Sequence, residues 1–187
     1  MNEIFLSASV PIVGRGNYHE TADPFLIQYA VRELVISVIR SSRIVWGGHP
    51  AITPMIWAIC ESLGVDYSQS VVLYQSKFFK DFFPEENQRF KNVNYVDAVN
   101  NDLNASLLKM RTEMLSRPQI SAAVFIGGME GIHAEYDLFK SFHPRAKVLP
   151  VGGTGGAARE LAHNLYALGH LASYTIDFAS LFHTELP

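Results

Sequence analysis

Short runs of β-branched and aromatic residues alternate along the chain with longer segments in which apolar residues recur every three or four positions. Runs of the first kind are typical of buried strands, and segments of the second kind are typical of amphipathic helices. We expect strands over residues 4–10, 43–46, 70–74, 120–126 and 147–151, and residues 93–96 allow one more short strand. We expect helices over residues 23–40, 53–64, 102–116, 131–142 and 155–168, and an amphipathic tail helix within 171–186 that docks on the domain or on a partner subunit.

Three helix starts carry local signals. Asp23-Pro24 and Thr53-Pro54 each join a capping side chain to a proline at the first helical position, and Asp102 caps a further helix. Strands and helices alternate without a linker or a low-complexity stretch, which is typical of a mostly parallel sheet with helices on both faces. The pattern therefore predicts a single domain over residues 1–187 with an α/β fold, a three-layer, Rossmann-like, doubly wound and mostly parallel sheet.

Glycine pairs end three of the expected strands, at Gly47-Gly48, Gly127-Gly128 and Gly152-Gly153. A glycine pair lets the backbone turn sharply and approach a ligand, and the N-terminus of the helix that follows favours an anion such as a phosphate. If the five strands lie in the order third, second, first, fourth, fifth, the loops after the first and fourth strands flank the topological switch point, where ligands of such sheets bind. Three such loops in one small domain predict a nucleotide site.

Composition narrows the class of ligand. Charged residues make up only 18% of the chain, the net charge is −3 and no dense Lys/Arg run occurs, which disfavours a nucleic-acid surface. Cys60 is the single cysteine, and the sequence contains neither a signal-peptide pattern nor a long apolar run, so we expect a cytoplasmic protein without a membrane contact. The seven histidines lack the spacing of a metal site, and we expect no metal ion and no cofactor.

The common nucleotide and hydrolase motifs do not occur. There is no Walker A sequence, no G-x-G-x-x-G after the first strand and no G-x-S-x-G elbow. Cys60 lies in an apolar helical stretch, which is typical of a buried small hydrophobe. Nucleotide binding, if it occurs, must therefore use a different arrangement of loops.

The first two loops offer hydroxyls and cations. Ser7 and Ser9 end the first strand and could donate to phosphate or ribose oxygens, although ordinary strand-end capping explains them equally well. Arg15 could close over a ligand or remain a solvated loop residue. In the second loop two prolines stiffen the chain around His49, which could donate to a phosphate or a base edge. The candidate ligand-binding residues of this loop are Gly47, Gly48, His49 and Thr53.

The third loop adds two carboxylates. Glu130 and Glu135 could accept hydrogen bonds from ribose hydroxyls, and Glu135 could act as a general base at the anomeric carbon or serve only as a favourable charge in the first helical turn. The candidate residues of the third loop are Gly127, Gly128, Met129, Glu130, Gly131 and Glu135, and those of the glycine-rich fourth loop are Gly152, Gly153, Thr154 and Gly155.

These loops resemble the SLOG superfamily, the Rossmann-like group that includes the lonely-guy phosphoribohydrolases and nucleotide-sensor domains. The resemblance rests on residues 44–50 and 125–135. The enzyme branch carries P-G-G-x-G-T-x-x-E, whereas this chain has Ile126 in place of the proline, no threonine after the third glycine and a loop one residue longer before Glu135. The sensor branch is closer, and its domains are associated with TIR and sirtuin-like effectors in antiphage defence. The resemblance implies a pocket lined by Gly47, Gly48, His49, Gly127, Gly128, Glu130, Gly131 and Glu135.

Three hypotheses follow. The first is a sensor domain that binds a nucleotide or a ligand derived from NAD or ADP-ribose, acting as a homo-oligomer with an effector protein. The second is a nucleotide N-glycosidase in which Glu135 assists the attacking water or stabilises the transition state. The third is an interaction subunit whose loops bind nothing and whose aromatic residues, 12% of the chain, contribute to an oligomer interface.

Overall fold

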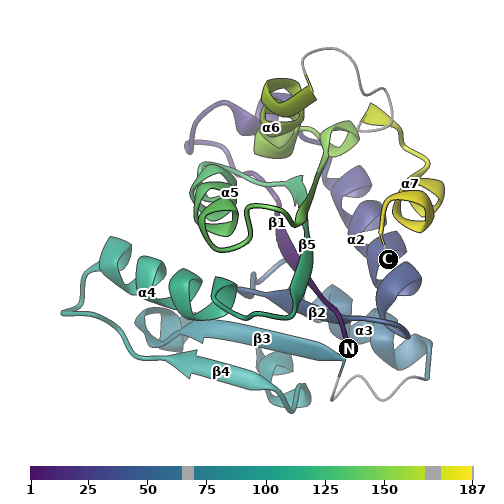
Figure 1. Cartoon of the computed structure of the whole chain (residues 1–187). Coiled ribbons are helices and arrows are strands. Elements are labelled where there is room, and N and C mark those ends of the chain that lie inside the picture. Colours follow the sequence, from purple (N-terminus) through teal and green to yellow (C-terminus); the bar gives the residue numbers. More distant parts are fainter. Residues whose placement is uncertain (65–69, 167–173, 187) are drawn as a thin grey trace.

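Six parallel strands form one sheet in the order β4-β3-β2-β1-β5-β6 (Figure 1). The structure is a computed structural model that describes residues 1–64, 70–166 and 174–186. The strands are β1 (Glu3–Ser9), β2 (Arg43–Trp46), β3 (Val71–Ser76), β4 (Val93–Val96), β5 (Ile120–Gly127) and β6 (Lys147–Val151). The expected order of the five main strands is confirmed, and the short strand at residues 93–96 extends the sheet beyond β3.

The switch point lies between β1 and β5. From β1 the chain runs outward through β2, β3 and β4, and it then returns to the other side of β1 to form β5 and β6. Leu6 of β1 is paired with Trp46 of β2 on one side and with Val124 of β5 on the other. The loops that leave β1 and β5 consequently diverge at the carboxyl edge of the sheet, which is where open α/β sheets bind ligands.

The helices agree closely with the amphipathic pattern. They are α1 (Tyr18–Thr21), α2 (Pro24–Val38), α3 (Thr53–Ser62), α4 (Leu103–Leu115), α5 (Gly131–Phe142), α6 (Gly156–Tyr166) and α7 (Phe178–Glu185), with 3₁₀ turns η1 (Lys77–Phe82), η2 (Glu85–Arg89) and η3 (Gly152–Thr154). The short α1 and the 3₁₀ turns were not expected. The predicted continuation of α6 to residue 168 and the start of the tail at 171–173 lie outside the described residues.

Two of the three helix caps are confirmed. The Asp23 carboxylate accepts from the N–H groups of Phe25 and Leu26, and the Asp102 carboxylate accepts from that of Ala105. The expectation for Thr53 is wrong, because α3 already begins at this residue and no side chain caps the helix. The Thr53 hydroxyl instead accepts a hydrogen bond from the backbone N–H of His49 at 3.2 Å.

Helices cover both faces of the sheet, as predicted. Ile4 and Leu6 of β1 pack against α2, α3 and α7 on one face, while Phe5 between them packs against α4, α5 and α6 on the other. This alternation follows from the two-residue period of a strand. Figure 1 shows how strongly the sheet twists between β5 and β4. The three-layer doubly wound architecture is thereby established.

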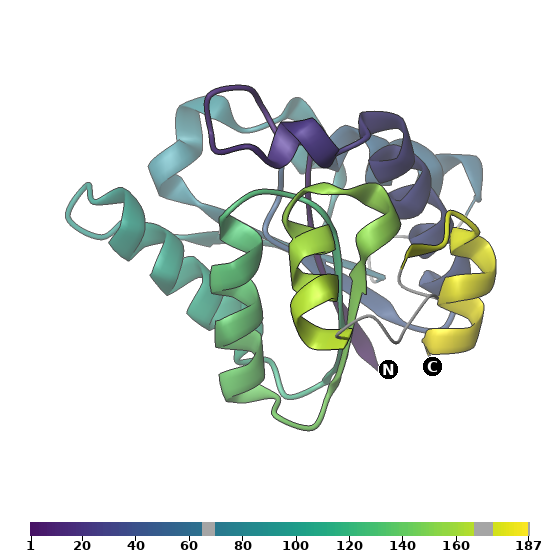
Figure 2. The ribbon, with the colours of Figure 1, turned by 90° about the horizontal axis from the view of Figure 1, so that it is seen from above.

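The C-terminal helix α7 docks on the body of the domain, one of the two alternatives expected for the tail. Phe178 and Phe182 are buried, and the ring of Phe178 lies 5.4 Å from that of Tyr29 in α2. Figure 2 shows α7, in yellow, beside α2. The helices within the described ranges are all too short or too polar to cross a bilayer.

Candidate functional site

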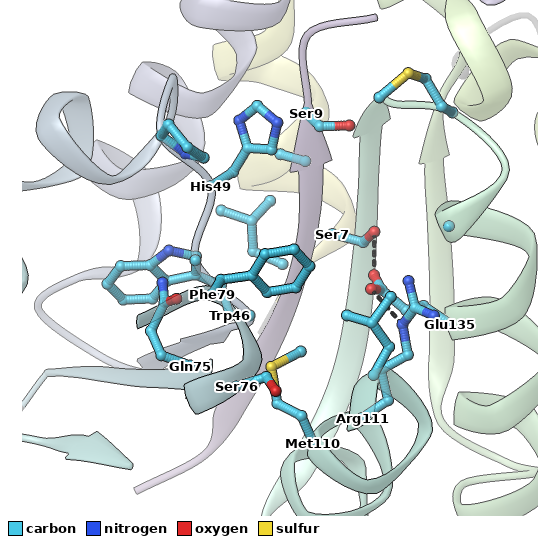
Figure 3. Close-up of a pocket in the computed structure, with 18 of the residues that line it drawn as sticks. Ser7, Ser9, Trp46, His49, Gln75, Ser76, Phe79, Met110, Arg111 and Glu135 are labelled. Atoms are coloured by element: carbon cyan, nitrogen blue, oxygen red, sulfur yellow. Dashed lines mark hydrogen bonds and ion pairs between the residues drawn. The ribbon is translucent and has the colours of Figure 1, made fainter. Parts of the chain in front are cut away.

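A cavity of about 360 Å³ opens at the carboxyl edge of the sheet, beside the switch point (Figure 3). The ends of β1, β2 and β3 form its base, and α4 and the start of α5 form one wall. Its size is within the range of roughly 300–1,000 Å³ that is typical of small-molecule sites. The lining residues that the argument below uses are Ser7, Ser9, Arg15, Gly47, Gly48, His49, Gln75, Phe79, Arg111, Met129, Gly131 and Glu135.

A hydrogen-bonded carboxylate lies on the β5 side of the cavity. The hydroxyl of Ser7 donates to Oε2 of Glu135 at 2.5 Å, and Nε of Arg111 donates to Oε1 at 3.0 Å. The three side chains come from β1, α5 and α4, and Figure 3 shows them converging from those elements. Both oxygens of the carboxylate are thus held in place, and each keeps a further lone pair for a hydroxyl donor.

His49 presents a neutral ring to the cavity. Its Nδ1 accepts from the backbone N–H of Ala51 at 3.2 Å, so the neutral ring carries its proton on Nε2. Burial, and to a lesser extent the positive charge of Arg15, lowers the pKa of His49. The site therefore offers an N–H donor at this position around neutral pH, together with the guanidinium of Arg15.

Glu130 lies outside the cavity. Its carboxylate makes an ion pair with Arg15, and both side chains are more than half exposed. Partial burial is the largest single effect and raises the pKa of Glu130, but the hydrogen bond from Arg15, a backbone hydrogen bond and the charges of Arg15 and Arg111 together lower it. Of the two candidate carboxylates, only Glu135 lines the cavity.

The glycine pair of the third loop is packed into the protein. A Cβ at Gly127 would lie 2.5 Å from Cδ1 of Ile27, and one at Gly128 would lie 2.2 Å from Cδ1 of Ile132. Both glycines also have positive φ values, 58° and 76°. Their role in the structure is to turn the chain tightly, and Met129 and Gly131 beyond them are the residues that reach the cavity.

The fourth glycine loop also lies outside the cavity. The hydroxyl of Thr154 accepts from the N–H of Gly127 and donates to the carbonyl of Val151. A Cβ at Gly155 would lie 1.9 Å from the carbonyl oxygen of Thr21, and one at Gly153 would lie 2.4 Å from that of Thr175. Close approach of protein backbone accounts for Gly153 and Gly155, and Gly152 is buried. Thr53 is likewise buried, and its hydroxyl accepts from the backbone N–H of His49.

Of the lining residues that the argument uses, three were not among the sequence candidates: Gln75, Phe79 and Arg111. Gln75 lies at the end of β3, and the loop that follows this strand has no glycine pair to indicate a ligand site. Phe79 lies in the irregular segment after it. The available signal was the group of phenylalanines at positions 78, 79, 82 and 83, immediately after a predicted strand. Arg111 belongs to α4, and only the packing of that helix brings its side chain to Glu135.

The described residues contain no cluster of three or more His, Cys, Asp or Glu side chains that could hold a metal ion. Cys60 is buried in α3, and burial raises the pKa of its thiol to about 11. The side chains available for chemistry in the cavity are therefore a carboxylate, two guanidinium groups, an imidazole, hydroxyls and an amide.

The fold and the cavity together define a Rossmann-like α/β protein with a small-molecule site at the topological switch point. Residues 17–186 match the model of the SLOG cluster3 family, and the chain belongs to this family. Membership suggests a nucleotide-sensing role. The resemblance expected from the loops is confirmed.

A solved structure supports the fold. The X-ray structure of TM1055, a target of the Northeast Structural Genomics Consortium, aligns with a TM-score of 0.50 over 87% of this chain and 81% of that chain. The two sequences are 14% identical, so this similarity concerns the fold alone. A comparison with curated proteins finds no match.

Proposed function

We propose that the cavity binds a nucleotide, or a ligand derived from NAD or ADP-ribose, and that the protein is a sensor domain. The observation that carries the proposal is the carboxylate of Glu135, fixed between Ser7 and Arg111 at the switch point of a SLOG-family fold. A fixed carboxylate with free lone pairs suits the paired hydroxyls of a ribose. A phosphate fits beside Arg15 and the Nε2–H of His49, and an aromatic ring lies across the cavity for a base.

Thermal denaturation with AMP, NAD and ADP-ribose tests this proposal. A ligand at about one hundred times its Kd adds roughly 2.7 kcal/mol of stability, which raises the Tm of a domain of this size by roughly 5–11 °C. We expect such a shift with at least one of the three ligands. Glu135→Gln should abolish most of it, because the amide loses the charge that the ribose hydroxyls and Arg111 contact.

Glu160→Gln is the matched control. Glu160 is exposed and contacts His133, away from the cavity, so the same chemical change there should leave the ligand-dependent shift intact. No shift with any of the three nucleotides would contradict the proposal and would favour an interaction subunit.

Hydrolysis of an N-glycosidic bond is the second candidate. The same oriented carboxylate favours it, because Glu135 could stabilise an oxocarbenium-like transition state or assist a water molecule. Chromatography of the incubated nucleotides separates the two functions. Release of the free base by the wild-type protein, and its loss in Glu135→Gln, would establish the enzyme; unchanged nucleotide with a thermal shift would establish the sensor.

A further inference from the structure

Gln75 is a mostly buried residue whose amide faces the cavity. The residue is only 6% exposed, it lies at the end of β3, and it lines the cavity. Within the part of the chain that the structure describes, no protein group forms a hydrogen bond with its side chain, and neither polar atom is fully closed off from solvent. Because the residue lines the cavity, its carboxamide is available to pair with water or with a molecule that enters there.

The surroundings of Gln75 keep it in that position. Gly48 has a φ of 70°, and a Cβ there would lie 1.7 Å from Nε2 of Gln75, so the glycine leaves the space that the amide occupies. The neighbouring Ser76 has its hydroxyl engaged as the acceptor for the N–H of Phe78 at the start of η1. Phe79 follows in the 3₁₀ turn η1, and Figure 3 shows Gln75 and Phe79 across the cavity from Ser7 and Glu135.

We propose that Gln75 and Phe79 form a subsite that selects adenine, a proposal that rests on the nucleotide-binding function proposed above. The Phe79 ring stacks on the base, as aromatic side chains do with every base. The carboxamide of Gln75 presents a donor and an acceptor side by side, which matches the amino group and adjacent ring nitrogen of adenine.

The rest of this wall explains the preference for adenine over other bases. Besides Gln75 and Ser76, its lining consists of Phe79, Phe82, Phe83 and Pro84 and of Trp46, whose indole N–H is closed off from solvent. Guanine, cytosine and uracil each carry a further polar group on the same edge, which would be buried against this apolar wall without a partner. The carboxylate of Glu135, which could accept from guanine, is held at the opposite side by Ser7 and Arg111.

Calorimetric titration with AMP, GMP, CMP and ribose 5-phosphate tests the inference. We expect the wild-type protein to bind AMP at least about tenfold more tightly than the other three, since a bidentate base contact contributes discrimination of this order. In Gln75→Leu, AMP affinity should fall by about tenfold or more, toward that of ribose 5-phosphate, while the affinity for ribose 5-phosphate itself stays unchanged. Gln28→Leu, at an exposed position of α2, makes the same change away from the cavity and should bind all four ligands like the wild type.

The outcomes separate this inference from the proposed function. Equal affinities of the wild-type protein for the three nucleotides, or normal AMP binding by Gln75→Leu, would overturn the adenine subsite and leave nucleotide binding standing. If none of the three nucleotides binds, the proposed function itself fails. If Gln75→Leu does not fold, two other measurements test the subsite. One is the base preference of the wild-type protein. The other is Phe79→Leu, in which AMP affinity should fall while ribose 5-phosphate affinity stays unchanged.

Discussion

Gly48 links the backbone geometry of the second loop to the chemistry of the cavity. Its left-handed φ of 70° disfavours any side chain, and the absent Cβ makes room for the amide of Gln75. Gly64, at the end of α3, has a similar φ of 59°, but a Cβ there would meet no heavy atom within 4 Å. The two glycines share a backbone conformation and differ in what lies around them.

This pair provides a controlled experiment. We expect Gly48→Ala and Gly64→Ala each to lower the free energy of unfolding by about 1–2 kcal/mol, because each places an L-residue in the left-handed region. Only Gly48→Ala should also weaken AMP binding, since its methyl group forces the Gln75 side chain out of its position. Urea denaturation and calorimetry measure the two effects, and unaltered AMP affinity in Gly48→Ala would show that the amide does not contact the ligand.

At this scale the sequence picks out several residues that line the cavity, and ligand binding by them stays a prediction. The lining residues Ser7, Ser9, Arg15, His49 and Glu135 were all expected, because each lies within a few positions of a strand end or a glycine pair. Gln75 and Arg111 were not, because the pattern around them does not reveal which way their side chains point. Their directions depend on how η1 and α4 pack against the end of the sheet.

Among the elements, the fourth glycine loop differs most from its sequence-based interpretation. Its composition suggested a phosphate cradle, but the loop is packed against α1, α2 and the third loop. Thr154 is fully buried and is the only described side chain that accepts from the N–H of Gly127. The loop therefore supports the third loop from behind, and the third loop in turn places Met129 and Gly131 at the cavity.

Thr154→Val tests this supporting role. Valine keeps the shape of the side chain but removes the acceptor, which leaves the buried N–H of Gly127 unpaired and should cost about 1–3 kcal/mol of stability. The AMP affinity of the folded variant should change by less than about threefold, because no atom of Thr154 reaches the cavity. A variant of normal stability with strongly reduced AMP binding would place the loop in contact with the ligand instead.

The main elements could be predicted because their periodicity is strong and their starts carry capping residues such as Asp23 and Asp102. The region from Lys77 to Arg89 could not. It contains two 3₁₀ turns, and the phenylalanines of η1 follow neither the helical nor the strand period. Phe79 departs from helical geometry within η1. Tertiary packing rather than local pattern determines such a segment.

For the whole molecule, the strand order explains where the cavity lies. From β1 the chain builds β2, β3 and β4 on one side, and it then crosses to the other side of β1 to build β5 and β6. The loops that leave β1 and β5 therefore diverge and open the edge of the sheet at this point. The cavity extends from this point toward β2 and β3 and not toward β6. The expected ligand position therefore lies between the second and third glycine loops, with the fourth loop behind.

A crystal structure of the protein with AMP tests the central claim most directly. We expect density for one nucleotide in the cavity, with the base against Phe79 and Gln75 and the ribose hydroxyls within hydrogen-bond distance of Glu135. The phosphate should lie beside Arg15 and His49. An empty cavity in crystals that hold AMP elsewhere, for example on the loop of Gly152, Gly153 and Gly155, would contradict the account.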